Sequence, residues 1–203
     1  MRYGRFMIAC LLVLSRALPA QQQKPAMVAE DGGLQERGSA RVLYWNPRAD
    51  TALGQFAIEY GRPAWKKEYD DSAKFDGLTN GKIWRLGSNF WTVLDTSLPL
   101  KIAGRAVPVG SYYLGLRRSA DGGTWSLAFI DPAKVRKARL DAFQIERAPV
   151  EFEMPMTMER GAGTSEKLTI TLSYTKENPK SVTLKIGWGK LSLRAPIEVT
   201  VGS

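Results

Sequence analysis

Apolar and polar residues alternate along most of the chain from residue 41 to residue 201. Residues 168–174 show the pattern most clearly, because every second residue is apolar and the others carry hydroxyl groups. A two-residue period puts successive side chains on opposite faces of a β-strand, so each such run predicts a half-buried strand. Similar runs occupy residues 55–60, 83–96, 98–102, 111–117, 124–130, 150–158, 182–188 and 190–201. About eight to ten short strands predict an all-β domain, either an antiparallel β-sandwich or a jelly-roll-like fold, with residues 81–116 at its centre.

Turn and helix signals separate these strands. Gly104-Arg105 and Asp121-Gly122 each lie between two apolar runs, which is typical of tight β-hairpins. Asp131-Pro132 begins the one short helix that the sequence predicts, over residues 133–143, because aspartate caps a helix and proline fits its first turn. Residues 66–81 are rich in charge and are predicted to form a loop.

The N-terminal residues 1–20 have the features of a secretory signal peptide. Arg2 and Arg5 precede an unbroken apolar run, residues 6–14, which is too short to span a bilayer. Cleavage is expected after Ala20, with Ala17 as an alternative, and lipid modification of Cys10 is disfavoured because apolar residues continue beyond it. We expect residues 21–40 to be a flexible leader, residues 41–203 to be a single β domain, and the protein to be periplasmic or secreted.

Composition excludes several classes of protein. The formal net charge of +9 falls to +6 when the three arginines of residues 1–20 are removed. These charges are dispersed along the chain, so nucleic acid is not an expected partner. The chain has no histidine, and its one cysteine is Cys10. An exported domain without these residues lacks the Ser-His and Cys-His pairs of nucleophilic catalysis and the usual ligands of transition metals. We expect no cofactor, no metal and no transmembrane segment after signal cleavage.

One polar and aromatic set forms the candidate ligand-binding site: Arg62, Trp84, Arg85, Asn89 and Trp91. An arginine beside a tryptophan at a strand end can stack on the ring or hold a carboxylate through two parallel hydrogen bonds. In the structural reading, which is favoured, Arg85 instead pairs with an internal acid such as Glu59 or Asp95, and Asn89 satisfies its own turn. Both readings are open at this point.

The tryptophans allow a second hypothesis, because exposed indole rings can form a platform for sugar rings. Four of them are candidates: Trp65, Trp91, Trp125 and Trp188. Trp125 and Trp188 are in phase with apolar neighbours, so they are predicted to be core residues. Trp65 and Trp91 are left open between core and platform.

Three short motifs carry a family resemblance: Trp84-Arg85-Leu86-Gly87-Ser88-Asn89, Pro108-Val109-Gly110-Ser111-Tyr112 and Tyr60-Gly61-Arg62-Pro63. In these motifs, and over about residues 54–201, the chain resembles the bacterial exported family called Domain of Unknown Function 2911. The family pattern continues with glutamate and alanine where this chain has Phe90-Trp91. If this glutamate takes part in chemistry in relatives, the present chain cannot perform that chemistry in the same way. The resemblance implies an exported bacterial protein and brings no activity with it.

Acidic residues offer two further readings. Asp70, Asp71 and Asp76 do not match the alternating ligand positions of a calcium loop, so a solvated turn is favoured. A glycosidase-like hydrolase would need two carboxylates in one cleft. Its candidates are Glu59, Asp95, Asp131, Glu151 and Glu153, and nothing in the sequence brings two of them together.

These observations predict a binding or interaction module over an enzyme. Its partner is an envelope ligand or protein, with a glycan as one candidate. The alternative is a carboxylate-based hydrolase of the cell envelope.

Overall fold

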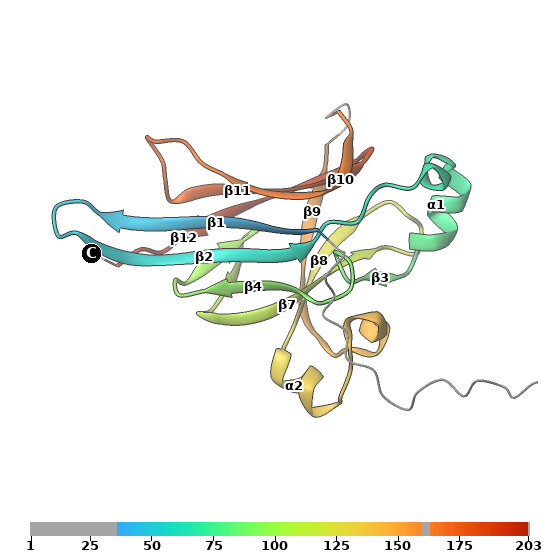
Figure 1. Ribbon diagram of the computed structural model, residues 1–203, viewed down its shortest axis with the longest axis horizontal. Helices are drawn as coiled ribbons and strands as arrows, with labels where there is room; N and C mark the ends of the chain where they lie inside the picture. The colour runs from blue at the N-terminus through green and yellow to red at the C-terminus, as the bar shows by residue number, and fades with distance from the viewer. Residues whose placement is uncertain (1–35, 160–162, 203) are drawn as a thin grey trace, which may run out of the picture. The chain divides into compact units, whose positions relative to one another are not determined.

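One continuous 12-stranded antiparallel sheet forms the domain, whose computed structural model describes residues 36–159 and 163–202 (Figure 1). Its two parts, which meet at β9 (Val150–Met158), are called here the first and the second sheet. The first sheet contains β1 (Arg37–Asn46), β2 (Thr51–Gly61), β3 (Ile83–Trp84), β4 (Thr92–Thr96), β7 (Gly110–Arg118), β8 (Trp125–Ile130) and β9. The second contains β5 (Leu100–Ile102), β6 (Arg105–Val107), β10 (Ser165–Ser173), β11 (Ser181–Gly189) and β12 (Leu191–Val199). The predicted all-β fold is confirmed.

β9 connects the two sheets on one side. It pairs with β8 along most of its length, and its last residues, Thr157 and Met158, pair with β12. On the other side, the Tyr60 hydroxyl accepts a hydrogen bond from the Ile170 N–H at 2.9 Å and donates one to the Ile170 carbonyl at 3.3 Å. The strand order is β1-β2-β4-β7-β8-β9-β12-β11-β10. The strands at its two ends, β1 and β10, lie close together.

The core follows the predicted alternation. Phe56 and Ile58 of β2 and Phe129 of β8 are buried, as their in-phase positions indicate. Trp125 and Trp188 are 4% and 8% exposed, so their prediction as core residues is confirmed. Burial of large aromatic side chains supplies much of the apolar stabilisation of a fold without disulfides.

The helical segments differ from the prediction. The segment expected to be a loop forms a 3₁₀ helix, η1 (Lys67–Asp70), and an α-helix, α1 (Ser72–Thr79). The helix expected over residues 133–143 is instead the short α2 (Pro132–Lys137) and a 3₁₀ helix, η2 (Ala142–Arg147). α1 is capped by the Asp71 side chain, which accepts hydrogen bonds from two backbone N–H groups. It buries none of its residues, so it lacks the apolar stripe by which a helix is recognised in sequence.

The start of the domain also differs from the prediction. β1 begins at Arg37, so residues 37–40, expected in the flexible leader, belong to the first strand. The rest of the predicted leader and the predicted signal peptide lie outside the described residues. Among the residues that the structure describes, no helix combines the length and the hydropathy needed to cross a membrane.

Tyr44 of β1 makes stability sensitive to alkaline pH. Its ring is buried, and its hydroxyl donates a hydrogen bond to the Pro179 carbonyl at 2.7 Å. Burial, with a smaller contribution from Tyr174, raises the pKa of Tyr44 from 10.0 to about 12. Because the folded-state pKa is raised, this stabilisation is complete below pH 10 and is lost as the pH rises from 10 to 12.

We expect the free energy of unfolding of the parent protein to fall faster than that of Tyr44→Phe across this window. The slopes of the free energy of unfolding against pH should differ by up to about 1.4 kcal/mol per pH unit. The reason is that the parent protein has a hydroxyl at residue 44 that ionises in the unfolded chain, whereas the variant has none there. Urea unfolding of both proteins at pH 9, 10 and 11 measures it. Parallel pH dependences of the two proteins would contradict the prediction.

Candidate ligand-binding site

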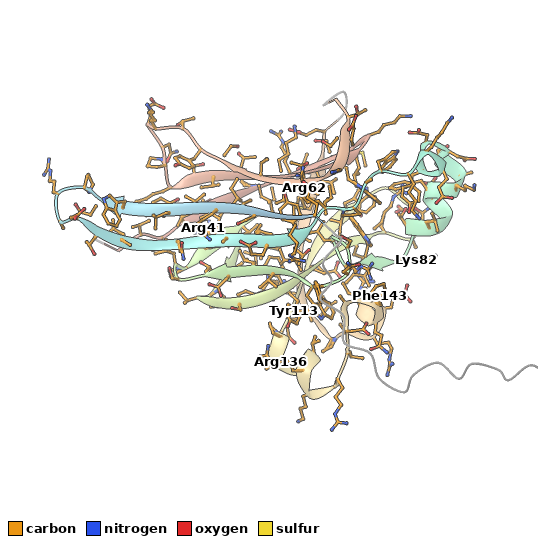
Figure 2. All side chains as sticks on the ribbon, in the orientation of Figure 1. Arg41, Arg62, Lys82, Tyr113, Arg136 and Phe143 are labelled. Atoms are coloured by element: carbon orange, nitrogen blue, oxygen red, sulfur yellow. The ribbon has the colours of Figure 1, made fainter. Side chains whose placement is uncertain are left out.

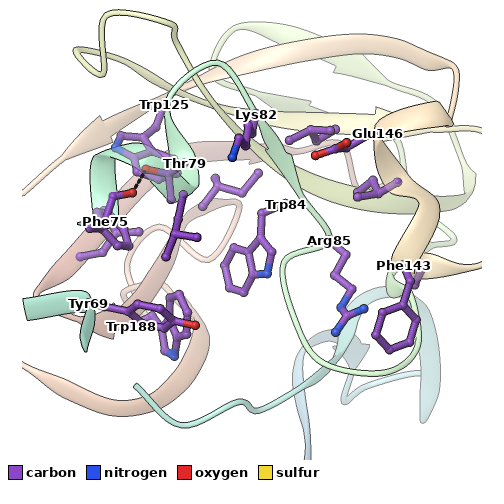
Figure 3. Close-up of a pocket in the computed structure, with 16 residues that line it drawn as sticks. Tyr69, Phe75, Thr79, Lys82, Trp84, Arg85, Trp125, Phe143, Glu146 and Trp188 are labelled. Carbon is purple, nitrogen blue, oxygen red and sulfur yellow. Dashed lines mark hydrogen bonds between the residues drawn. The ribbon is translucent and has the colours of Figure 1, made fainter. Parts of the chain in front are cut away.

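An aromatic pocket lies where α1, β3 and η2 meet (Figure 3). Its volume is about 370 Å³, which is within the range of small-molecule sites. Six aromatic side chains line it: Tyr69, Phe75, Trp84, Trp125, Phe143 and Trp188. Its polar lining comes from Thr79, Lys82, Arg85 and Glu146.

Trp188 organises the aromatic wall. Trp84 stacks on it, with ring centres 4.8 Å apart and an angle of 16° between the planes. The rings of Trp65 and Tyr69 also contact it, at 5.0 Å and 5.3 Å between centres. The Trp188 Nε1–H donates a hydrogen bond to the Pro63 carbonyl at 2.9 Å, so the ring is held by these aromatic contacts and at its polar end.

β3 and the turn after it position Trp84 and Arg85. β3 pairs with β7 and ends at Trp84, so Arg85 begins the turn. Asn89, later in this turn, has a φ of +62°, a conformation that asparagine adopts more readily than most residues. Gly61 lets the turn approach β2, because a Cβ at that position would lie 2.4 Å from the Ser88 carbonyl oxygen. The motifs around residues 61 and 87 thus form one corner of the fold.

Arg85 reaches the pocket from this turn. Its Nε–H donates a hydrogen bond to the Gly87 carbonyl at 3.3 Å, and its guanidinium lies 3.8 Å from the centre of the Phe143 ring (Figure 3). Among the described residues, no carboxylate oxygen lies within 4.0 Å of its nitrogens. Partial burial lowers the pKa of Arg85, and the charge of Asp141 opposes that shift.

The partners expected for Arg85 in the structural reading are wrong. Glu59 accepts a hydrogen bond from the Ser39 hydroxyl, and Asp95 accepts one from the Ser111 hydroxyl. Both acids lie on strands of the first sheet, β2 and β4, and pair across to neighbouring strands. The prediction assumed that Arg85, next to Trp84, pairs with an acid at a corner of the fold. The position of its guanidinium depends instead on the path of the turn after β3, which the sequence pattern does not give.

The five residues predicted as one site are only partly brought together. Trp84 and Arg85 line the pocket, but the other three do not. Arg62 forms an ion pair with Glu36 and donates a hydrogen bond to a β10 carbonyl, so it ties β2 to β10, apart from Phe143 in Figure 2. Asn89 lies in the turn. Trp91 stacks on Tyr113, with ring centres 4.7 Å apart, and packs against the smaller apolar cluster.

Sequence reasoning missed most of the pocket lining. Tyr69 and Phe75 lie in the segment predicted to be a charged loop, and Phe143 lies at the end of the predicted helix. Phe143 is 68% exposed, although it is large and apolar. The available signal was the presence of two aromatic residues within an otherwise charged segment, which indicates that one face of that segment contacts the domain.

The acidic residues have other roles. Asp71 caps α1, Asp70 pairs with Lys190, and Asp76 pairs with Arg118. In the described part of the chain, no group of three or more potential metal ligands comes together.

The acids considered for hydrolysis are also engaged elsewhere. Asp131 caps α2, Glu151 pairs with Lys134, and Glu153 pairs with Arg117. Glu146 is the one carboxylate among the residues that line the aromatic pocket.

Comparisons with known proteins place this geometry in context. A family model described as "Protein of unknown function (DUF2911)" matches residues 47–197, which include β3, the turn after it and every aromatic residue of the pocket. The chain is also 31% identical over 114 residues to the isoleucine–tRNA ligase of Methanopyrus kandleri. That match covers 53% of this chain but only 10% of the ligase, so the chain spans about a tenth of that relative's length. No solved structure matches the chain significantly.

Proposed function

The chain belongs to the DUF2911 family of proteins of unknown function, and we propose that its domain binds a sugar ring of an envelope glycan in the aromatic pocket. The protein is proposed to act after export, in the periplasm or outside the cell. The pattern of residues 1–20 supports that location. The N-terminal residue of the protein recovered from cells tests it, since retention of Met1 would exclude cleavage.

The observation that carries the proposal is the position of Trp84. Its indole ring is stacked on Trp188, and the residue lines the pocket, so we assign the part of the ring that faces the pocket as the surface for a ligand (Figure 3). A flat indole face fits the apolar face of a sugar ring, while nearby polar groups can bind its hydroxyls. Lys82 and Glu146 provide such groups in the same lining.

Binding is favoured over hydrolysis by the distribution of acids. Most glycoside hydrolases place two carboxyl groups about 5–10 Å apart across the scissile bond. The pocket lining contains Glu146 but no second carboxylate, and the other candidate acids are engaged elsewhere. The hydrolase alternative therefore has no supporting observation, whereas the aromatic lining supports a binding role.

A glycan array followed by titration of tryptophan fluorescence tests the proposal. We expect the purified protein to bind a subset of glycans, and Phe143→Ala to weaken that binding by about ten-fold, because it removes one aromatic wall. Phe143 is 68% exposed, so its loss should leave the fold intact.

Trp45→Ala is the matched control. Trp45 is 48% exposed on β1 and does not line the pocket, so its replacement should leave the affinity unchanged. The proposal fails if no glycan binds the parent protein. It also fails if Phe143→Ala binds as tightly as Trp45→Ala.

A further inference from the structure

Arg85 shows which kind of sugar fits the pocket. We propose that the ligand is an acidic sugar whose ring lies on Trp84 and whose carboxylate is bound by the Arg85 guanidinium. This inference rests on the proposed function, because it specifies the ligand of the same pocket.

The first argument comes from comparing Arg85 with similar arginines. Four arginines of the described residues are half-buried: Arg62, Arg85, Arg117 and Arg118. Three of them form an ion pair with a carboxylate of the domain: Arg62 with Glu36, Arg117 with Glu153, and Arg118 with Asp76. A half-buried guanidinium is costly unless acceptors surround it, so pairing is the expected arrangement. Arg85 alone among these four has no carboxylate within 4.0 Å in the described part of the chain.

The second argument is that Arg85 is oriented for a ligand. Its Nε–H donates a hydrogen bond to the Gly87 carbonyl at 3.3 Å, and its guanidinium carbon lies over the Phe143 ring, 3.8 Å from the ring centre. These two contacts restrict the side chain before any ligand arrives, which lowers the entropy lost on binding. The Nη groups remain for an acceptor, and their planar arrangement matches the two oxygens of a carboxylate.

The other charges around the pocket fit a ligand that is acidic and rich in hydroxyls. Lys82 lines the pocket, and its ammonium donates a hydrogen bond to the Gly77 carbonyl at 3.0 Å. Glu146 also lines the pocket but is not paired with Arg85, so it does not occupy the guanidinium. A sugar ring can donate hydroxyls to Glu146 while its own carboxylate faces Arg85.

Titration with a matched pair of sugars tests the inference. The probes are methyl β-glucuronide and methyl β-glucoside, which differ only at C6, where the glucuronide has a carboxylate and the glucoside a hydroxymethyl group. We expect the parent protein to bind the glucuronide at least about ten-fold more tightly, and added salt to reduce that preference. We expect Arg85→Gln to lose this preference, so that it binds the glucuronide and the glucoside with affinities equal within about two-fold.

Arg105→Gln is the control variant. Arg105 also stacks on an aromatic ring, with its guanidinium 4.5 Å from the centre of Phe152, but it is exposed and lies outside the pocket. It should keep the full preference for the glucuronide. A loss of preference in Arg105→Gln equal to that in Arg85→Gln would show a general charge effect and overturn the inference.

The outcomes separate this inference from the proposed function. Equal binding of the two sugars overturns the carboxylate assignment while leaving sugar binding in place. Glucose 6-phosphate binding about ten-fold more tightly than the glucuronide would overturn it in favour of a phosphorylated sugar. A protein that binds neither these sugars nor any glycan of the array contradicts both proposals. A thermal melt of Arg85→Gln well below that of the parent would show that Arg85 holds the fold and would also overturn the inference.

Discussion

Trp188→Ala is expected to lower the free energy of unfolding by about 3–5 kcal/mol, the usual cost of replacing a buried tryptophan by alanine. Trp188 is 8% exposed and contacts the rings of Trp84, Trp65 and Tyr69. Its removal would open a cavity behind the pocket and leave the Pro63 carbonyl without the indole donor. Urea unfolding followed by far-ultraviolet circular dichroism measures the change without relying on tryptophan fluorescence.

Two variants separate packing from hydrogen bonding at this position. Trp188→Phe keeps an aromatic ring but removes the hydrogen bond to Pro63, so it should cost clearly less than Trp188→Ala. Trp45→Ala removes an indole that is 48% exposed and should change stability by less than about 1 kcal/mol. If Trp188→Ala and Trp45→Ala unfold at the same urea concentration, the aromatic wall does not stabilise the domain as described.

Gly189→Ala is expected to destabilise the domain by about 2–5 kcal/mol, through backbone strain and overpacking together. The φ of Gly189 is +55°, a backbone conformation that residues other than glycine adopt only at a cost in free energy. A Cβ at this position would lie 2.0 Å from the Trp65 ring, which packs against Trp188. The ring would have to move, and the wall of the pocket would move with it. The affinity for the proposed glycan ligand should therefore fall as well.

Gly104→Ala is a matched control for the backbone term. Gly104 has a φ of +85° in the β5–β6 hairpin, and a Cβ built there has no heavy atom of the described residues within 4 Å, apart from those of its neighbours in the chain. Gly104→Ala introduces backbone strain but no steric clash, so it should lower the free energy of unfolding by about 1–2 kcal/mol. The difference between the two variants measures the contact with Trp65. Equal losses of stability in both would show that Trp65 can move away freely.

The strands could be predicted because their signal is local. In β8, β10 and β11, a residue's face follows from its position in an alternating run, and Trp125 and Trp188 were correctly placed in the core on that ground. The hairpin at Gly104 was found for the same reason, since its turn type depends on the residues at the turn itself.

α1 and the pocket lining could not be predicted in this way. α1 depends on its Asp71 cap and on the contact of one face with the rest of the domain, not on a buried stripe of its own. Arg118 fixes it from β7, through an ion pair with Asp76 at 2.6 Å and a hydrogen bond to the Thr79 hydroxyl at 2.9 Å. These partners are separated by about 40 residues, so no short window of sequence contains the information.

The sequence by itself determined the all-β class, the faces of most strands, the absence of histidine chemistry and the family of the chain. Each of these depends on residue types or on short-range periodicity. Only the tertiary structure decided which candidate residues share a site, because Trp84 and Arg85 meet Phe143 and Trp188 through strand pairing and turns distant in sequence. It also decided that Arg85 has no carboxylate partner in the described residues while Arg62 does. The type of a residue states which bonds it can make, but the positions of all the other side chains decide which bonds are left for a ligand.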